Sequence, residues 1–329
     1  MELDSILSPI KEELILFDER LRANLNSDSA LISQVAVHLV DRKGKRLRPA
    51  MVFLSYRTCM NSKVNPAWNP RVMNVALAVE FIHTATLLHD DVIDQSKVRR
   101  GQVSVNHKWN NMVSVLMGDF LLAKALRLIV ETKSLSLLST ASRATEKLSI
   151  GEMNEVQESH NFDLDEETYL QIISAKTASL FTASCESGAL TAGAEKKVQE
   201  KLKEYGENLG MAFQITDDLL DWVGETKKTG KGLGNDLKEG KITLPLIHTL
   251  RECDPRSRNK ILKLLENDFN QKDFDKILSL IKGNGGVKYA QKKASAFGEK
   301  ALSFLSELKD SEYKKALQDL VTFVIKRDK

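Results

Sequence analysis

Cysteine is scarce in this chain, and neither sign of charge dominates it. The three cysteines, Cys59, Cys185 and Cys253, are far apart and odd in number, which fits neither a disulfide framework nor a zinc site. We therefore expect reduced thiols and a cytoplasmic protein. The 48 basic and 45 acidic residues leave a net charge of +3, which argues against a nucleic-acid partner. The acidic, amphipathic N-terminus lacks the features of a signal peptide.

Uninterrupted hydrophobic runs are also absent. The most apolar stretch, MVSVLMGDFLLAKALRLIV from Met112, is broken by Asp119, Lys124 and Arg127, so it predicts a buried core helix and no integral membrane segment. Alternating strand patterns are nearly missing, whereas helical spacing dominates. No shift in composition marks a domain boundary. The sequence therefore predicts one all-α domain over residues 1–329, with roughly ten or more helices.

Several helix limits can be predicted from capping residues. Asn69 followed by Pro70 is typical of a helix start, and Asp165 with two glutamates behind it is another. A long helix is expected over 196–223, and Pro245 is expected at the start of the next one. The glycine- and lysine-rich stretch 224–241 predicts a mobile loop and not a helix. Its glycine spacing does not match a Walker A loop, and no strand precedes it, which excludes that kind of nucleotide site.

Two aspartate clusters stand inside apolar helical sequence. The first lies in HTATLLHDDVID and the second in DDLLD, and their members are Asp90, Asp91, Asp94, Asp217, Asp218 and Asp221. Residues four apart share one face of a helix, so two aspartates of each cluster stack. A single such cluster is as often a solvated polar face as a functional site. The apolar neighbours of both clusters favour function.

Six carboxylates that share one cavity need positive charge, since each like-charge pair at ~4 Å costs on the order of 4 kcal/mol at an effective dielectric of 20. Oxygen ligands favour a hard divalent cation, and Mg²⁺ combines a few carboxylates with phosphate oxygens and water. Calcium is the alternative, but neither cluster has EF-hand spacing. Basic groups follow both clusters in the chain, and GKRLRP adds a third group before a helix. Together, these charges indicate a site for metal ions and a diphosphate.

The motifs GKRLRP, FIHTATLLHDDVIDQSKVRRG, SAKTASLF, GMAFQITDDLLDWVG and TGKGLGNDLKEGKITLP resemble the trans-type polyprenyl diphosphate synthases in order and spacing. The resemblance covers about residues 43–250 and continues more weakly near Gly285. It implies an all-α isoprenoid synthase fold around a deep central cavity, a homodimer, and up to three Mg²⁺ ions. The implied reaction is head-to-tail condensation of isopentenyl diphosphate onto an allylic diphosphate.

The resemblance also implies roles for individual residues. Asp90, Asp94 and Asp217 would hold the Mg²⁺ ions, with Asp91, Asp218 and Asp221 completing or supporting the clusters. Positions matching those that contact the allylic diphosphate are Arg99, Lys176, Lys231 and Lys241. Positions matching those that hold isopentenyl diphosphate are Lys45, Arg48, His83 and Arg100. Polar groups near the developing carbocation would be Thr177 and Gln214, and catalysis is assigned to these two with Lys176 and Lys231.

Some of these residues also have an ordinary structural interpretation. A lone histidine such as His83 on an apolar helix is more often a core group, although its spacing from Asp90 places it on the same face. His89 is expected to be structural, and Gln214 alone would be read as a core-facing polar residue. Lys176 among small and apolar residues is a less ordinary surface charge.

Product length is expected to depend on the helix upstream of Asp90. By resemblance, synthases of short products place bulky aromatics where this chain has Ala85 and Thr86. Small residues predict a product longer than farnesyl diphosphate, of the kind used for quinone side chains. Candidates for a deeper cavity floor are Leu116, Met117, Phe120 and Leu121, and periodicity does not decide among them.

Four other functions compete with this interpretation. A short-chain synthase would differ only in product. A terpene cyclase would have no use for GKRLRP, and an inactive partner subunit of a heteromeric synthase would be expected to lose aspartates. A plain helical scaffold leaves the acidic and basic motifs unexplained. Dependence of activity on Mg²⁺ distinguishes the enzymes from the two non-catalytic alternatives.

Overall fold

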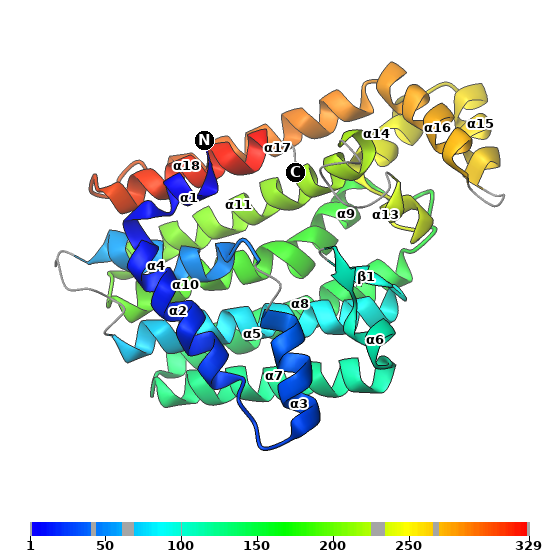
Figure 1. Ribbon diagram of the computed structural model, residues 1–329. Helices are drawn as coiled ribbons and strands as arrows, with labels where there is room; N and C mark the ends of the chain where they lie inside the picture. The colour runs from blue at the N-terminus through cyan, green and yellow to red at the C-terminus, as the bar shows by residue number, and fades with distance from the viewer. Residues whose placement is uncertain are drawn as a thin grey trace. The chain divides into compact units, whose positions relative to one another are not determined.

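The computed structural model describes residues 2–40, 44–60, 69–99, 101–224, 234–265 and 270–327. Most of these residues lie in helices, which confirms the all-α prediction (Figure 1). In the first half of the chain the elements are α1 (Leu3–Ile6), η1 (Ser8–Ile10), α2 (Lys11–Asn24), α3 (Ala30–Val40), α4 (Leu47–Cys59), α5 (Pro70–Ile93), β1 (Val98–Arg99), β2 (Gln102–Val103), α6 (Val105–Lys108), α7 (Asn111–Glu131) and α8 (Leu135–Gln157).

In the second half of the chain, helices are the only regular elements of the described part. Its elements are α9 (Glu166–Ile173), η3 (Ser174–Ala178), α10 (Ser179–Thr191), α11 (Lys196–Val223), α13 (Asn235–Lys238), α14 (Leu244–Glu252), α15 (Pro255–Leu265), α16 (Gln271–Gly283), α17 (Gly286–Leu305) and α18 (Glu312–Lys326). The two short strands pair as an antiparallel hairpin.

The chain divides into two compact units, each built from separate segments. Unit 1 contains Met1–Glu146, Leu180–Gly206 and Phe304–Leu320. Unit 2 contains Lys147–Ser179, Glu207–Ser303 and Val321–Lys329.

Unit 1 is organised around α5, which packs along α7 (Figure 1). The Ser114 hydroxyl on α7 donates to the Leu88 carbonyl of α5 at 2.9 Å. Gly118 permits the close approach, since a Cβ there would lie 2.2 Å from Nε2 of His89. His89 therefore packs against α7, which agrees with its expected structural role. Phe17 and Phe53 meet edge to face in the same unit, with ring centroids 6.4 Å apart.

One helix of the described residues, α5, is long and apolar enough to cross a membrane, judged by length and composition. Of its most apolar 18-residue window, 67% is buried inside the structure. Buried core helices of globular proteins pass the same test.

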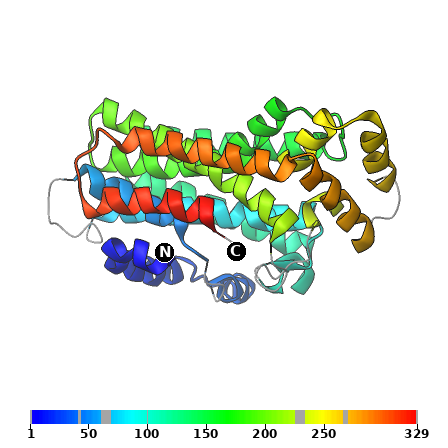
Figure 2. The same ribbon diagram turned by 90° about the horizontal axis from the view of Figure 1, so that it is seen from above.

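Unit 2 has its own apolar core, in which Trp222 of α11 stacks on Phe274 of α16 with centroids 5.4 Å apart. The Trp222 indole donates to the Thr243 hydroxyl at 2.8 Å, so its polar group is satisfied. Burial of each such ring stabilises the unit by roughly 1.5–3 kcal/mol. The end of α18 lies against α17 (Figure 2), where Gly298 faces the Ile325 side chain.

The predicted helix limits are confirmed. The Asn69 side chain accepts from the backbone N–H of Arg71, and Asp165 accepts from that of Thr168 at 2.7 Å. Helix α11 has the expected bounds, and Pro245 lies in the first turn of α14. The three cysteines are free thiols.

The prediction of a loop without helix over 224–241 is wrong in its described part. Residues 235–238 form the single turn α13. Gly234 precedes it with a φ of +75°, which favours glycine, and the carboxylate of Asp221 accepts from the first two backbone N–H groups of the turn. A tertiary contact with a side chain of α11 thus creates a helix that glycine content argues against.

Candidate functional site

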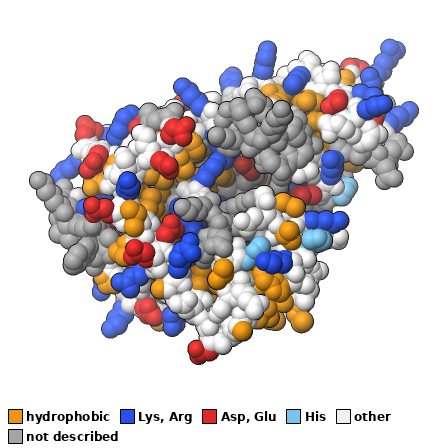
Figure 3. All heavy atoms as spheres, viewed as in Figure 1, with side chains coloured by type: hydrophobic (Ala, Val, Ile, Leu, Met, Phe, Trp, Pro, Cys, Tyr) orange, Lys and Arg blue, Asp and Glu red, His pale blue; other side chains and the backbone are white. Residues whose placement is uncertain are grey.

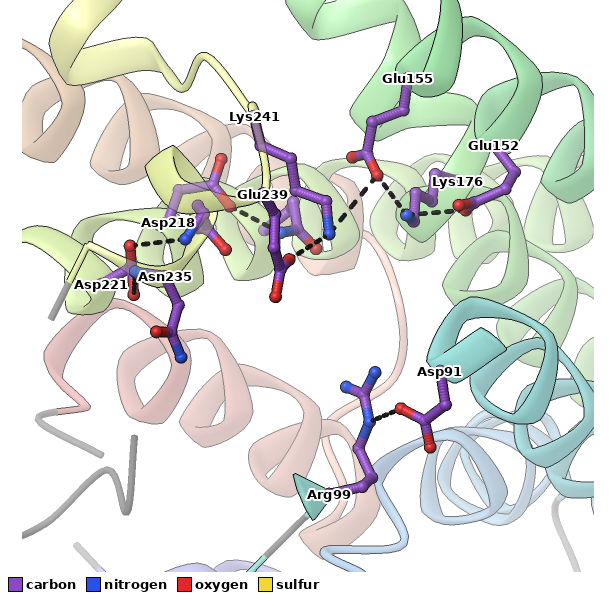
Figure 4. A network of polar contacts seen from close by, with 12 residues as sticks. Asp91, Arg99, Glu152, Glu155, Lys176, Asp218, Asp221, Asn235, Glu239 and Lys241 are labelled. Atoms are coloured by element: carbon purple, nitrogen blue, oxygen red, sulfur yellow. Dashed lines mark hydrogen bonds and ion pairs between the residues drawn. The ribbon is translucent and has the colours of Figure 1, made fainter. Parts of the chain in front are cut away.

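The first aspartate cluster lies at the C-terminal end of α5, in unit 1. Asp91 is 2% exposed and pairs with Arg99 of β1, with 2.7 Å between Oδ1 and Nε (Figure 4). Burial alone would lower the pKa of the Arg99 guanidinium, but the charges of Asp91, Asp90 and Asp94 outweigh it and raise that pKa. Asp91 therefore has a supporting role in this structure, and Arg99 meets the cluster directly.

Both clusters lie at the end of a long helix, where the last carbonyl groups carry partial negative charge. Negative side chains are unfavourable there by about 0.3–1 kcal/mol each at exposed sites. The sequence therefore places aspartates where they destabilise the free protein and attract cations.

Arg48 and His83, two residues predicted to hold isopentenyl diphosphate, lie together in unit 1. The Arg48 Nη1 of α4 is 3.1 Å from Nε2 of His83 on α5, and its guanidinium lies over the Phe181 ring at 4.8 Å. Lys45 is exposed just before α4. Arg100 lies outside the described residues.

The second cluster, in unit 2, is joined to a chain of hydrogen bonds. Gln214 accepts from the Thr177 hydroxyl and donates to Oδ1 of Asp218, both at 2.7 Å. The Tyr169 hydroxyl donates to the other oxygen of Asp218 at 2.5 Å. Thr177 and Gln214 thus lie together, and Asp218 holds Gln214 in place.

Burial raises the pKa of the Asp218 carboxyl from 3.8 to about 7, and the nearby charges of Asp217 and Glu155 act in the same direction. The hydrogen bonds from Tyr169 and Gln214 oppose this shift without cancelling it. A bound cation would favour the ionised carboxylate, so metal uptake and loss of this proton are coupled.

This pKa predicts a pH-dependent stability in metal-free protein. Between about pH 4 and 7 the folded state binds more protons than the unfolded state, so stability falls as pH rises through that range. Asp218→Asn removes the effect. With EDTA present, we expect the variant's stability relative to wild type to increase from pH 5 to pH 8, on the order of a few kcal/mol. Denaturant unfolding at both pH values measures it, and an unchanged difference would contradict the raised pKa.

Asp217 and Asp221 have different partners within unit 2. Arg327, just past α18, donates from Nη2 to Oδ1 of Asp217 and to the Phe213 carbonyl, both at 2.9 Å. Its guanidinium also lies 3.9 Å from the centroid of the Phe213 ring. Asp221 caps α13, so a predicted metal ligand has a structural partner here.

The two described lysines predicted to bind the allylic diphosphate are engaged with glutamates of unit 2. The Lys176 Nζ lies 2.7 Å from Glu152 and 2.5 Å from Glu155, and the Lys241 Nζ lies 2.7 Å from Glu239 (Figure 4). Lys231 lies outside the described residues.

Lys176 and Thr177 stand on the π-helical turn η3, where an α-helix was expected without interruption. Such turns are frequent at functional sites. Gly151 of α8 lies against this turn, since a Cβ at that position would be 2.5 Å from the Lys176 backbone nitrogen. The close approach brings the glutamates of α8 to Lys176.

Gly151→Ala is expected to destabilise the protein by about 1–3 kcal/mol, because backbone atoms cannot move aside cheaply. The displaced turn should also weaken diphosphate binding through Lys176. Gly283→Ala is the matched control, since a Cβ there meets nothing within 4 Å. Thermal unfolding gives the Tm of both variants, and pyrophosphate titration gives their Kd. Equal Tm and Kd values in Gly151→Ala and Gly283→Ala would refute the packing argument.

The chain-length candidates divide by burial. Ala85 is fully buried on α5, and Thr86 is partly exposed and donates to the His83 carbonyl. On α7, Met117 and Leu121 are buried, whereas Leu116 is 60% exposed and Phe120 is partly exposed. Leu116 lies on the outer surface of the helix, so Met117 and Leu121 remain the better candidates for a cavity floor.

Among the described residues, no three His, Cys, Asp or Glu side chains converge to hold a metal ion by themselves. The oxygen donors nevertheless fit a hard cation, because Mg²⁺ typically takes one or two carboxylates and completes its shell with phosphate and water. The raised pKa of the Asp218 carboxyl shows that its negative charge is poorly stabilised, and Asp217 already pairs with a positive group, Arg327. Both carboxylates would therefore be stabilised by a cation.

Sequence reasoning missed several residues here, namely Glu152, Glu155, Tyr169, Asp236, Glu239 and Arg327. Asp236 follows the glycine loop, and the pKa of its carboxyl is raised by removal from water and by the charges of Asp221 and Asp218. The motif GND contains it, so the stretch TGKGLGNDLKEGK carried a usable signal. Glu239 lies in the same stretch, whereas the other four residues come from other parts of the chain and carry no such signal.

A family model described as polyprenyl synthetase matches residues 29–281. The chain is 35% identical to an all-trans-nonaprenyl-diphosphate synthase of Rhodobacter capsulatus, over 98% of this chain and 97% of that protein. It is 34% identical to an octaprenyl diphosphate synthase of Escherichia coli over the full length of both.

A solved structure is also similar. A polyprenyl synthase from Caulobacter crescentus, complexed with calcium and isoprenyl diphosphate, superimposes with a TM-score of 0.93 and 37% identity, over 100% of this chain and 98% of that one. These matches agree with the all-α helices of the structure. The chain belongs to the polyprenyl synthetase family, as its motifs predict.

Proposed function

We propose that this protein condenses isopentenyl diphosphate head-to-tail onto an allylic diphosphate and makes an all-trans product longer than farnesyl diphosphate. The main support is full-length similarity to octaprenyl and nonaprenyl synthases. Ala85 and Thr86 support the long product, because neither side chain is bulky enough to block a growing chain beside Asp90.

Mg²⁺ is the proposed cofactor, in up to three ions held by Asp90 and Asp94 on one helix and Asp217 on the other. When bound, it neutralises the charge that develops on diphosphate as the allylic C–O bond breaks. Both clusters are proposed to act on one diphosphate. The calcium in the Caulobacter relative's structure supports a divalent-cation site in this family.

The chain's own groups would divide the remaining work. Lys176, Lys241, Lys231 and Arg99 would take oxygens of the allylic diphosphate, and their charges stabilise the leaving group most in the transition state. The pair Arg48 and His83, with Lys45 and Arg100, would hold the second diphosphate. The side-chain oxygens of Thr177 and Gln214 would face the carbocation, held in place by Asp218.

A homodimer is proposed from an apolar stripe on α7. The stripe consists of four residues on one face of the helix, with 55–67% of each exposed: Met112, Leu116, Leu126 and Val130. Hydrophobic side chains reach the surface among the charged ones in Figure 3. An exposed stripe of this kind is typical of a protein interface. A cytoplasmic location is proposed from the free thiols.

One assay tests the function. The protein is incubated with Mg²⁺, isopentenyl diphosphate and farnesyl diphosphate, and the lipid formed is sized by chromatography. We expect a long-chain diphosphate and none with EDTA. A hydrocarbon formed without consumption of isopentenyl diphosphate would mean a cyclase. Pyrophosphate binding without any product would favour a partner subunit.

A further inference from the structure

One carboxylate of unit 2 lies between two lysines that the proposed function assigns to diphosphate. Oε2 of Glu155 is 2.5 Å from Nζ of Lys176 and 3.9 Å from Nζ of Lys241 (Figure 4). The lysines come from separate elements, η3 and the segment before α14, whereas Glu155 stands on α8. Its charge therefore acts on both ammonium groups at once.

The local charge balance is unfavourable for an incoming anion. Among the ion pairs of the described residues, three carboxylates, those of Glu152, Glu155 and Glu239, pair with two ammonium groups. All five side chains are only 16–25% exposed, so their interactions are less screened than those of surface ion pairs. An anion can bind strongly to these ammonium groups only if a carboxylate moves away from them.

Glu155 is the carboxylate best placed to do so. All three glutamates have the same rotatable bonds, but only Glu155 lies within 4 Å of both lysines among the ion pairs of the described residues. Glu152 pairs with Lys176 alone, and Glu239 pairs with Lys241 alone. Rotation of Glu155 would remove one negative charge from beside both ammonium groups in one movement, while Glu152 stays with Lys176 and Glu239 with Lys241. A phosphate oxygen accepts the same N–H bonds that the carboxylate accepts.

We propose that Glu155 is a specificity-determining residue that competes with the diphosphate for Lys176 and Lys241, a role that rests on the proposed function. A single phosphate carries too little charge to displace the carboxylate, whereas a diphosphate with bound cations displaces it. Glu155 thereby discriminates diphosphates from monophosphates. It forms its ion pairs with the two lysines again when pyrophosphate leaves.

The test is Glu155→Gln, which keeps the side-chain length and an acceptor oxygen but removes the charge. Calorimetric titration of the full-length protein with inorganic pyrophosphate, with Mg²⁺ present, gives Kd. We expect Kd to fall about tenfold, which corresponds to ~1.4 kcal/mol. The Kd for inorganic phosphate should fall by a larger factor than the Kd for pyrophosphate. The ratio of the two Kd values, which measures the preference for pyrophosphate, should therefore decrease.

Two further variants make the result decisive. Glu146→Gln removes one charge from an exposed position of α8 and is expected to leave both Kd values unchanged. Glu155→Asp retracts the carboxylate by one methylene and should lower the pyrophosphate Kd by roughly two- to threefold. Circular dichroism shows whether the glutamine variant folds. If it does not fold, the aspartate variant provides the test.

Three outcomes would overturn the proposal: equal or weaker pyrophosphate binding by a folded Glu155→Gln variant, an equal gain in Glu146→Gln, or an unchanged preference over phosphate. Failure of wild-type protein to bind pyrophosphate with Mg²⁺ would instead overturn the proposed function itself. The two failures are therefore distinguishable.

Discussion

Replacing Asp90 with asparagine should lower kcat/KM by at least about a thousandfold, equivalent to ~4 kcal/mol of transition-state stabilisation. The amide loses the charge that holds a cation on the departing diphosphate. Stability should stay level or rise slightly, because the variant removes a negative charge from the C-terminal end of α5. Loss of activity without loss of stability distinguishes a metal ligand from a structural residue.

Glu131→Gln is the matched control for Asp90→Asn. Glu131 is also the acid at the end of a long helix, α7, but its partners are Arg127 of the same helix and the side-chain amide of Asn74 on α5. Steady-state kinetics should show wild-type activity for this control. Activity of Asp90→Asn within about tenfold of wild type at saturating Mg²⁺ would refute the assignment of Asp90.

The second large effect concerns product length. Ala85→Phe should shorten the product to about the length of farnesyl diphosphate. The reason is that an aromatic ring about one turn before Asp90 would block the path of the growing chain. Ala85 is fully buried, so the larger ring also strains the packing by about 1–3 kcal/mol. Thr86→Phe avoids most of that strain, since Thr86 is already partly exposed.

Chromatography of the products after exhaustive reaction measures both variants. Leu135→Phe is the control, because its side chain is 84% exposed at the start of α8 and should leave the product length unchanged. A wild-type product distribution in both Ala85→Phe and Thr86→Phe would remove the argument that small residues here permit long products.

Local signals in the sequence predicted much of the fold. The caps at Asn69 and Asp165 and the limits of α11 follow from residues within one or two turns, so they can be read from the chain alone. The short helix α13 could not be read in this way. It depends on a carboxylate of α11 that accepts from its first N–H groups, and glycine content in the loop points the other way.

The candidate site shows the same division. Its aspartates, Lys176 and the pair Thr177 and Gln214 lie in motifs with distinctive spacing, and the structure places the pair in hydrogen-bond contact. Partners that balance the charge come from elsewhere in the chain. Arg327 meets Asp217 from 110 positions away, and Glu155 meets Lys176 from 21 positions away. Such pairings arise from helix packing, which periodicity does not encode.

A crystal structure with Mn²⁺ and a non-reactive allylic diphosphate analogue tests the central claim most directly. Mn²⁺ substitutes for Mg²⁺ and is located by anomalous scattering. The account predicts metal ions on Asp90 and on Asp217 that bridge one and the same diphosphate. Ions or analogue bound at only one cluster, or Asp90 and Asp217 facing separate solvent regions, would contradict it.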